Sequence, residues 1–182
     1  MIVKNIRVLF KFSYPYILDL RDMIRILKDL GYTVSSNLPS LPPGSMTLGS
    51  ISAMRDDLQL EFNNVTGTIS FFTQSLGYIT LIKEEVRKLI SDLRLGKIDY
   101  IEVTFEAILN GRLNLDLKIL GGDVVGIEIV SDKKNVRINS YMAMADSSYL
   151  LITYKLNEIN EIGNAVDDMR KTFQELENLG LR

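Results

Sequence analysis

Hydrophobic and polar positions alternate in several short stretches of the chain, and a period of two is typical of half-buried β-strands. Residues 5–12, for example, place Ile6, Val8, Phe10 and Phe12 on one face. A short strand is predicted at 32–34, and the alternation recurs at 58–62, 65–72, 101–109, 113–119, 125–129, 136–140 and 150–154. Together these stretches predict a sheet of about eight strands.

Three other stretches change to the helical period of 3.6. They are residues 17–30, the segment from Ile79 to Gly96, and about 158–179. Apolar side chains recur there every three or four residues, which predicts amphipathic helices that each bury one stripe. Gly31 and Gly96 are the predicted C-terminal caps of the first two helices, and Thr80 is the predicted N-cap of the second.

The connections between the predicted strands are short turns. Asn110-Gly111, which stands between two alternating runs, is the strongest hairpin signal and predicts that 101–109 pairs with 113–119. Short hairpins force antiparallel pairing, and helices with one apolar stripe each cover one face of a sheet. The predicted fold is therefore a single α+β domain spanning residues 1–182, with an antiparallel sheet of about eight strands and three helices packed on one face.

The predicted order of elements is strand, helix, three short strands, helix, five strands and helix. Its first part resembles half of a TATA-binding-protein-like unit and, more loosely, a helix-grip fold, in which a curved sheet wraps a long C-terminal helix. The resemblance is one of layout only, because no motif of either family matches residue by residue. A second unit would lack its internal helix, so no repeat is predicted, and the layout implies no function.

Composition removes most enzyme classes from consideration. Among the 182 residues there is no Cys and no His, which excludes disulfides, thiolate nucleophiles, imidazole bases and zinc sites built from nitrogen or sulfur. Neither GxxxxGK[ST] nor GxGxxG occurs, so these phosphate-binding loops are excluded and no cofactor is expected. The 21 basic and 23 acidic residues give a net charge of −2, which is not the basic balance expected of a nucleic-acid-binding protein.

The sequence also argues against a membrane partner. Its longest charge-free stretch, between Asp29 and Arg55, contains Pro39, Pro42, Pro43, Gly44 and Gly49 and therefore does not predict a membrane-spanning helix. Lys4 and Arg7 interrupt what would have to be the hydrophobic core of a signal peptide. We therefore expect a cytoplasmic protein, and the absence of Cys is compatible with that reducing compartment.

Carboxylates are the remaining candidates for chemistry. Glu102 and Glu106 share one face of a predicted strand, and a bulge that shifts the predicted hairpin by one residue would place Asp116 beside them, with Glu128 on the following strand. Oxygen ligands of this kind suit Mg²⁺ or Mn²⁺ and would serve a divalent-metal phosphohydrolase. The competing interpretation, a solvated sheet face neutralised by neighbouring basic residues, is favoured because alternating polar residues on an antiparallel strand need no other explanation.

Three other features are candidate binding surfaces. The Pro-rich stretch 37–49 predicts either a docking segment or lid, or an ordinary connection between strands. Residues 141–145 are apolar on both faces, which indicates core, subunit interface or pocket lining. A single layer of helices would also leave some apolar sheet residues uncovered. The predicted binding or interface residues are Leu41, Met46, Phe71, Tyr141, Met142 and Met144.

These features favour a non-catalytic binding domain that self-associates as a homodimer through uncovered apolar sheet residues. The first alternative is a pocket protein for an apolar small molecule, in which the last helix crosses the curved sheet and 37–49 acts as a gate. A divalent-metal phosphohydrolase is the second alternative.

Overall fold

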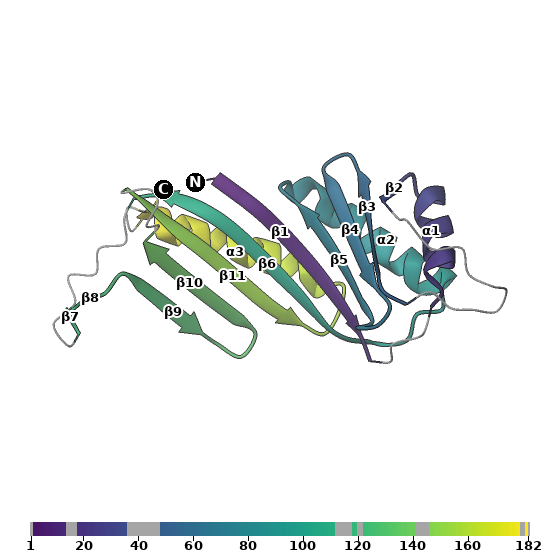
Figure 1. Cartoon of the computed structure of the whole chain (residues 1–182). Coiled ribbons are helices and arrows are strands. Elements are labelled where there is room, and N and C mark those ends of the chain that lie inside the picture. Colours follow the sequence, from purple (N-terminus) through teal and green to yellow (C-terminus); the bar gives the residue numbers. More distant parts are fainter. Residues whose placement is uncertain are drawn as a thin grey trace.

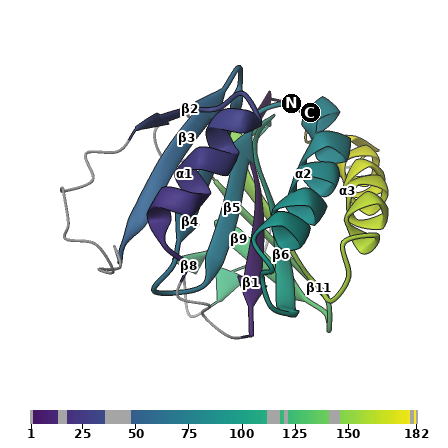
Figure 2. The same ribbon diagram turned by 90° about the vertical axis from the view of Figure 1, so that its right-hand side faces the viewer.

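The computed structural model describes residues 2–13, 18–35, 48–111, 118–119, 122–140, 146–178 and 181. Its main feature is one antiparallel sheet of nine strands, accompanied by three α-helices. All three helices lie on the same side of the sheet, and the other face is open (Figures 1 and 2). The predicted α+β class is confirmed.

The strands of the main sheet are β1 (Ile2–Phe12), β2 (Thr33–Ser35), β3 (Ser50–Arg55), β4 (Leu58–Asn63), β5 (Thr68–Thr73), β6 (Ile98–Asn110), β9 (Gly126–Val130), β10 (Lys134–Ser140) and β11 (Ser147–Leu156). The helices are α1 (Leu20–Asp29), α2 (Ile79–Asp92) and α3 (Glu161–Asn178), and a 3₁₀ helix spans Leu76–Tyr78. A separate two-stranded ribbon consists of β7 (Lys118–Ile119) and β8 (Gly122–Asp123). The order across the main sheet is β2-β3-β4-β5-β1-β6-β11-β10-β9.

This strand order contains an internal repeat. β1 and β6 lie side by side at the centre, where Val8 pairs with Val103. Outward from β1 come β5, β4, β3 and β2, and outward from β6 come β11, β10 and β9. Each half begins with its central strand and closes with a helix, α2 or α3, after its outermost strands have been formed. The sequence predicted no repeat, because a second unit would lack the internal helix. In the described residues, the second half indeed has no counterpart of α1.

The predicted hairpin at Asn110-Gly111 is wrong. Both edges of β6 are occupied along residues 101–108: opposite Phe105, for example, lie Ile6 on β1 and Ile152 on β11. The predicted partner therefore finds no free edge along these residues; Lys118 and Ile119 pair with β8 instead, and residues 113–117 lie outside the described residues. A local turn signal was outweighed by two long-range pairings, which bury a strand in the middle of the sheet on both of its edges.

The helix ends follow local rules, but not always at the predicted residues. Asp19 caps α1 by accepting a hydrogen bond from the backbone N–H of Arg21 at 2.9 Å, and Gly31 follows that helix at φ +84°, as predicted. The prediction of Thr80 as an N-cap is wrong, because α2 continues directly from the 3₁₀ helix and already begins at Ile79. Gly96 is also not the cap, since Arg94 takes the left-handed conformation at φ +50°.

The core lies between the sheet and the helices. Alternate side chains of the central strands point inward and are fully buried, and Phe10 contacts Phe71 edge to face with ring centroids 6.0 Å apart. In the second half, Phe105 and Tyr154 repeat this arrangement at 6.0 Å. These inward residues pack against the apolar stripes of α2 and α3, which consist of Ile79, Ile82, Val86, Leu89, Ile162, Ala165, Val166, Met169, Phe173 and Leu176.

A buried charged cluster holds α2 against the edge of the first half. Glu85 of α2 is only 4% exposed and forms an ion pair with Arg55 of β3. The hydroxyl of Tyr32 donates a 2.5 Å hydrogen bond to Glu85, and the Arg55 guanidinium lies 4.8 Å from the centre of the Tyr32 ring. Burial and the neighbouring Glu85 raise the pKa of Tyr32, which keeps its hydroxyl protonated as a donor. Arg55 also donates to the carbonyl of Leu30, at the end of α1, at 2.7 Å.

We predict that Glu85→Gln lowers the free energy of unfolding by about 2 kcal/mol, because it leaves the mostly buried Arg55 charge without its carboxylate partner. Urea unfolding monitored by circular dichroism measures the change. The matched control is Glu84→Gln, since Glu84 is exposed on the same helix and should shift stability by less than about 0.5 kcal/mol. Equal effects of the two substitutions would contradict the role assigned to the cluster.

Candidate binding surface

The structure places the sequence-predicted binding residues in two groups. Leu41, Met46, Tyr141, Met142 and Met144 lie outside the described residues, as does most of the stretch 37–49. Phe71 is described, and its side chain has no exposed surface because the alternation of β5 points it toward the helices. In the single chain it is therefore a core residue.

The predicted metal ligands are not brought together. Asp116 lies outside the described residues. Glu106 and Glu128 stand on β6 and β9, which are separated by β11 and β10, so about 14 Å lies between them at roughly 4.8 Å per strand. In the described part of the chain, no group of three acidic side chains is close enough to share a metal ion.

Two of these carboxylates have basic partners on neighbouring strands. Glu102 is hydrogen-bonded to Arg7 of β1, and Glu128 accepts hydrogen bonds from Asn135 at 2.7 Å and from Arg137 at 2.9 Å. The bonds from Asn135 and Arg137 lower the pKa of Glu128. Both contacts are those expected of a solvated, charge-balanced sheet face.

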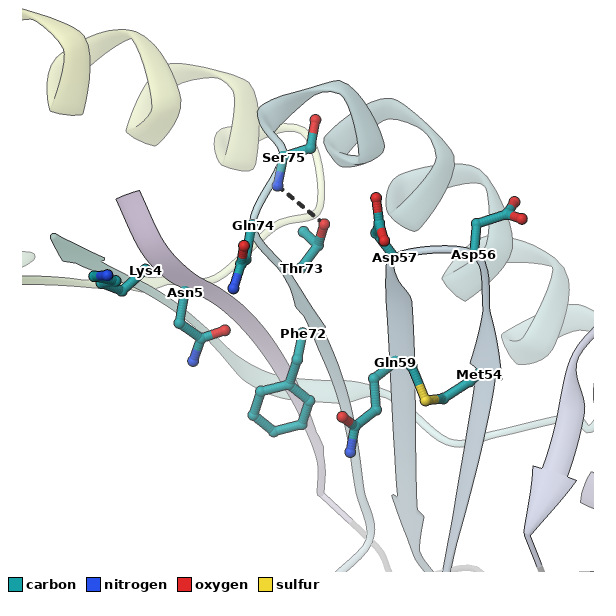
Figure 3. A pocket seen from close by; sticks show the side chains of 10 residues that line it. All are labelled: Lys4, Asn5, Met54, Asp56, Asp57, Gln59, Phe72, Thr73, Gln74 and Ser75. Atoms are coloured by element: carbon teal, nitrogen blue, oxygen red, sulfur yellow. Dashed lines mark hydrogen bonds between the residues drawn. The ribbon is translucent and has the colours of Figure 1, made fainter. Parts of the chain in front are cut away.

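A polar hollow of about 440 Å³ lies at one end of the open face (Figure 3). Lys4 stands on one side, Asp56 and Asp57 stand on the other, and Phe72 lies between them. Its remaining lining residues are Asn5, Met54, Gln59, Thr73, Gln74 and Ser75. Charged and amide side chains of this kind suit a polar molecule, and the lining differs from the apolar pocket that the sequence favoured as an alternative.

β9 is an edge strand whose outer backbone is unpaired in the described structure. Ser131 donates to the carbonyl of Lys134, and Ser140 donates to that of Val125, both at 2.8 Å. Hydrogen-bonded pairs alternate along an antiparallel ladder, so Ile127 and Ile129 bond to β10. The N–H and C=O groups of Gly126, Glu128 and Val130 therefore point away from the sheet.

Exposed apolar side chains are concentrated in the sequence at and just before β9. Among the described residues, the large hydrophobic side chains that are exposed are Ile2, Leu48, Met54, Val65, Ile119, Val125, Ile129 and Val130. The last four fall within residues 118–130, and Val130 is 70% exposed. An unpaired edge flanked by apolar side chains is a template for pairing with another chain.

An apolar groove of about 300 Å³ lies behind the same strand, between β9, β10 and α3. Its floor is formed by inward-facing side chains of the two strands, and one wall is formed by α3. The lining residues are Ile127, Ile129, Ser131, Lys134, Val136, Ile138, Thr172, Glu175 and Leu176. The β9 end of the molecule thus offers both free backbone groups and an apolar hollow.

A charged cluster holds α3 beside this groove. Lys134 donates hydrogen bonds to Asp168 at 2.6 Å and to Thr172 at 2.7 Å, and the hydroxyl of Tyr154 donates to Asp168 at 2.8 Å. The hydrogen bond from Lys134 is the main cause that lowers the pKa of Asp168. Burial and Asp168 in turn raise the pKa of Tyr154, so this hydroxyl remains a donor.

The sequence predicted the strand that corresponds to β9, but not its position at the edge of the sheet. A signal was present, since Ile129 and Val130 are consecutive apolar residues and would face opposite sides of any strand. That pattern marks a strand with apolar side chains on both faces, and it does not say whether the strand is central or at an edge.

Comparison of the sequence with protein-family models and with curated proteins finds no significant match. None of the helices in the described ranges has the length and apolar content needed to cross a membrane.

We predict that Asp168→Asn lowers the free energy of unfolding by about 1 kcal/mol at pH 7, a small value because the Asp168 side chain is half exposed. A carboxyl whose folded-state pKa is lowered stabilises the fold above its unfolded-state pKa, and this contribution is lost as the pH falls through the folded-state pKa. The difference between wild type and variant should therefore shrink as the pH falls and vanish below the folded-state pKa of Asp168.

Denaturant unfolding across the pH range measures this difference. Asp167→Asn is the matched control, because among the described residues Asp167 pairs with Arg170 alone, on the exposed face of α3, and its loss should matter less at every pH. A wild-type advantage over Asp168→Asn that grows toward acid would show that the assigned sign is wrong.

Proposed function

We propose that the protein is a non-catalytic interaction domain that self-associates as a homodimer through β9. The observation that supports this proposal is the outer edge of β9, which is unpaired among the described residues, together with the exposed apolar side chains of Val125 and Val130. Pairing of this edge would satisfy the outward backbone groups and remove apolar surface from water in one step.

A second copy of the chain is the partner that fits this edge. Two β9 strands related by a two-fold axis run antiparallel, as all neighbouring strands of the main sheet already do. The axis brings the two Glu128 side chains close to each other, and each is already paired with its own Arg137. The strand can therefore meet its copy without bringing two unpaired negative charges together.

We retain the cytoplasm as the proposed location, on the compositional grounds given above. The alternative expected from the sequence is a site for an apolar small molecule. Such a ligand would occupy the apolar groove behind β9, and a binding test with decanoate distinguishes this alternative.

We predict that the wild-type protein is a dimer at micromolar concentration and that Val130→Pro is a monomer. Proline removes the N–H of residue 130, which points outward, and leaves the hydrogen bonds between β9 and β10 intact. Light scattering coupled to gel filtration gives the mass. The control is Val65→Lys, which removes an exposed apolar side chain in the β4–β5 turn and should leave the dimer unchanged. A monomeric wild type would exclude the proposal.

The absence of Cys from the chain allows a second, geometric test. A single introduced Cys can form a disulfide only with another copy, and facing residues of an antiparallel pair have Cα atoms about 4.5–5.5 Å apart, within the range that a disulfide spans. We predict that Glu128→Cys or Ile129→Cys, depending on the register, cross-links under mild oxidation, and that Val65→Cys does not. The absence of cross-linking at both β9 positions would contradict pairing through this strand.

A further inference from the structure

We infer that the groove behind β9 is a docking site for an amphipathic helix of a partner protein. The inference goes beyond self-association, because it concerns the inward-facing side chains of β9 and β10 and not the outward backbone edge.

The internal repeat indicates which kind of structural element would bind in this groove. Counted outward from the central strands, β9 occupies the place that β3 has in the first half. There, α1 packs on β3 and β2 and buries Leu20, Met23, Ile26 and Leu27. α1 thus covers the outer end of the first half on the helix side of the sheet (Figure 2).

In the second half, no described helix covers the equivalent surface. In chain order, the segment between β6 and β9 corresponds to the segment between β1 and β2 that contains α1, and its described part includes the β7–β8 ribbon, which extends beyond the sheet (Figure 1). Ile129, whose side chain lines the groove, is 58% exposed, whereas Ile51 of β3 is 3% exposed. The apolar floor therefore remains where the corresponding helix is absent from the described residues.

The chemistry of the groove favours a helix over an extended segment. Its floor is a sheet face, where the backbone groups of Val136 and Ile138 are already used in the ladder with β9. An occupant must therefore satisfy its own backbone hydrogen bonds, as a helix does and an extended peptide does not.

The wall of the groove adds a charge preference. Thr172, Glu175 and Leu176 follow one another at helical spacing along α3. Glu175 forms no ion pair with any residue in the described ranges, whereas Lys134 on the groove floor is held by Asp168. The expected partner helix therefore carries apolar residues at i, i+3, i+4 and i+7 and a basic residue that faces Glu175.

The test uses a fluorescently labelled synthetic peptide of residues 18–31, which contains α1, and the full-length protein. Fluorescence anisotropy should show saturable binding, and a scrambled peptide of the same composition should not bind. Ile129→Lys should weaken binding at least about tenfold, because it places a charge on the apolar floor. Val65→Lys, at a residue that is also 58% exposed, should have no effect.

The inference is overturned if the peptide does not bind, or if Ile129→Lys binds it as well as wild type does. Ile129→Ser serves as a milder variant, and circular dichroism melting checks that both variants remain folded. Addition of decanoate tests whether the groove binds an apolar small molecule instead of a helix. If the protein binds decanoate and does not bind the peptide, the groove is a small-molecule site and the inference is overturned. Val130→Pro should retain peptide binding whether or not the wild type is a dimer, so failure of either proposal is visible separately.

Discussion

The pairing of β1 with β6 is the interaction on which the rest of the structure depends. These two long strands, which are far apart in sequence, run antiparallel from Ile2 opposite Ile108 to Phe12 opposite Ile98. Their contact joins two half-sheets into one, with a common core on the helix side. It also leaves each central strand only one further edge, which β5 and β11 fill, so every other strand must lie further out.

The two halves hold their helices by the same chemistry. In each, a tyrosine hydroxyl donates to a carboxylate on the covering helix, and a cation from an outer strand pairs with that carboxylate and lies over the tyrosine ring. The residues are Tyr32, Glu85 and Arg55 in the first half and Tyr154, Asp168 and Lys134 in the second. The first cluster also reaches the end of α1 through the Leu30 carbonyl, and the second lies at the rim of the open groove. The halves thus differ mainly in what covers their outer ends.

The functional proposals rest on this difference in what covers the outer ends of the two halves. On the open face, Glu102 and Glu128 are each paired with a basic residue of a neighbouring strand. At the β9 end, the outward backbone N–H and C=O groups have no partner among the described residues. Exposed apolar side chains line the groove on the helix side. Strand pairing uses the first and helix docking uses the second, so two binding events can share one end of the molecule without using the same atoms.

The sequence by itself determined most of the strands and helices and which face of each is buried, because the period of two or 3.6 is a local property of the chain, but β3 was missed. It predicted the first helix with Gly31 after it, the strands at 125–129, 136–140 and 150–154, which overlap β9, β10 and β11, and the one-sided α+β layout. It did not determine which strands pair: the turn signal at Asn110-Gly111 predicted a neighbour for β6 that the long-range partners β1 and β11 exclude. It could not place the candidate binding surface either, since Phe71 and Ile129 are both apolar strand residues. Only the tertiary structure made the first a core residue and left the second exposed at an edge, because burial depends on which elements lie beside a strand and not on the strand's own pattern.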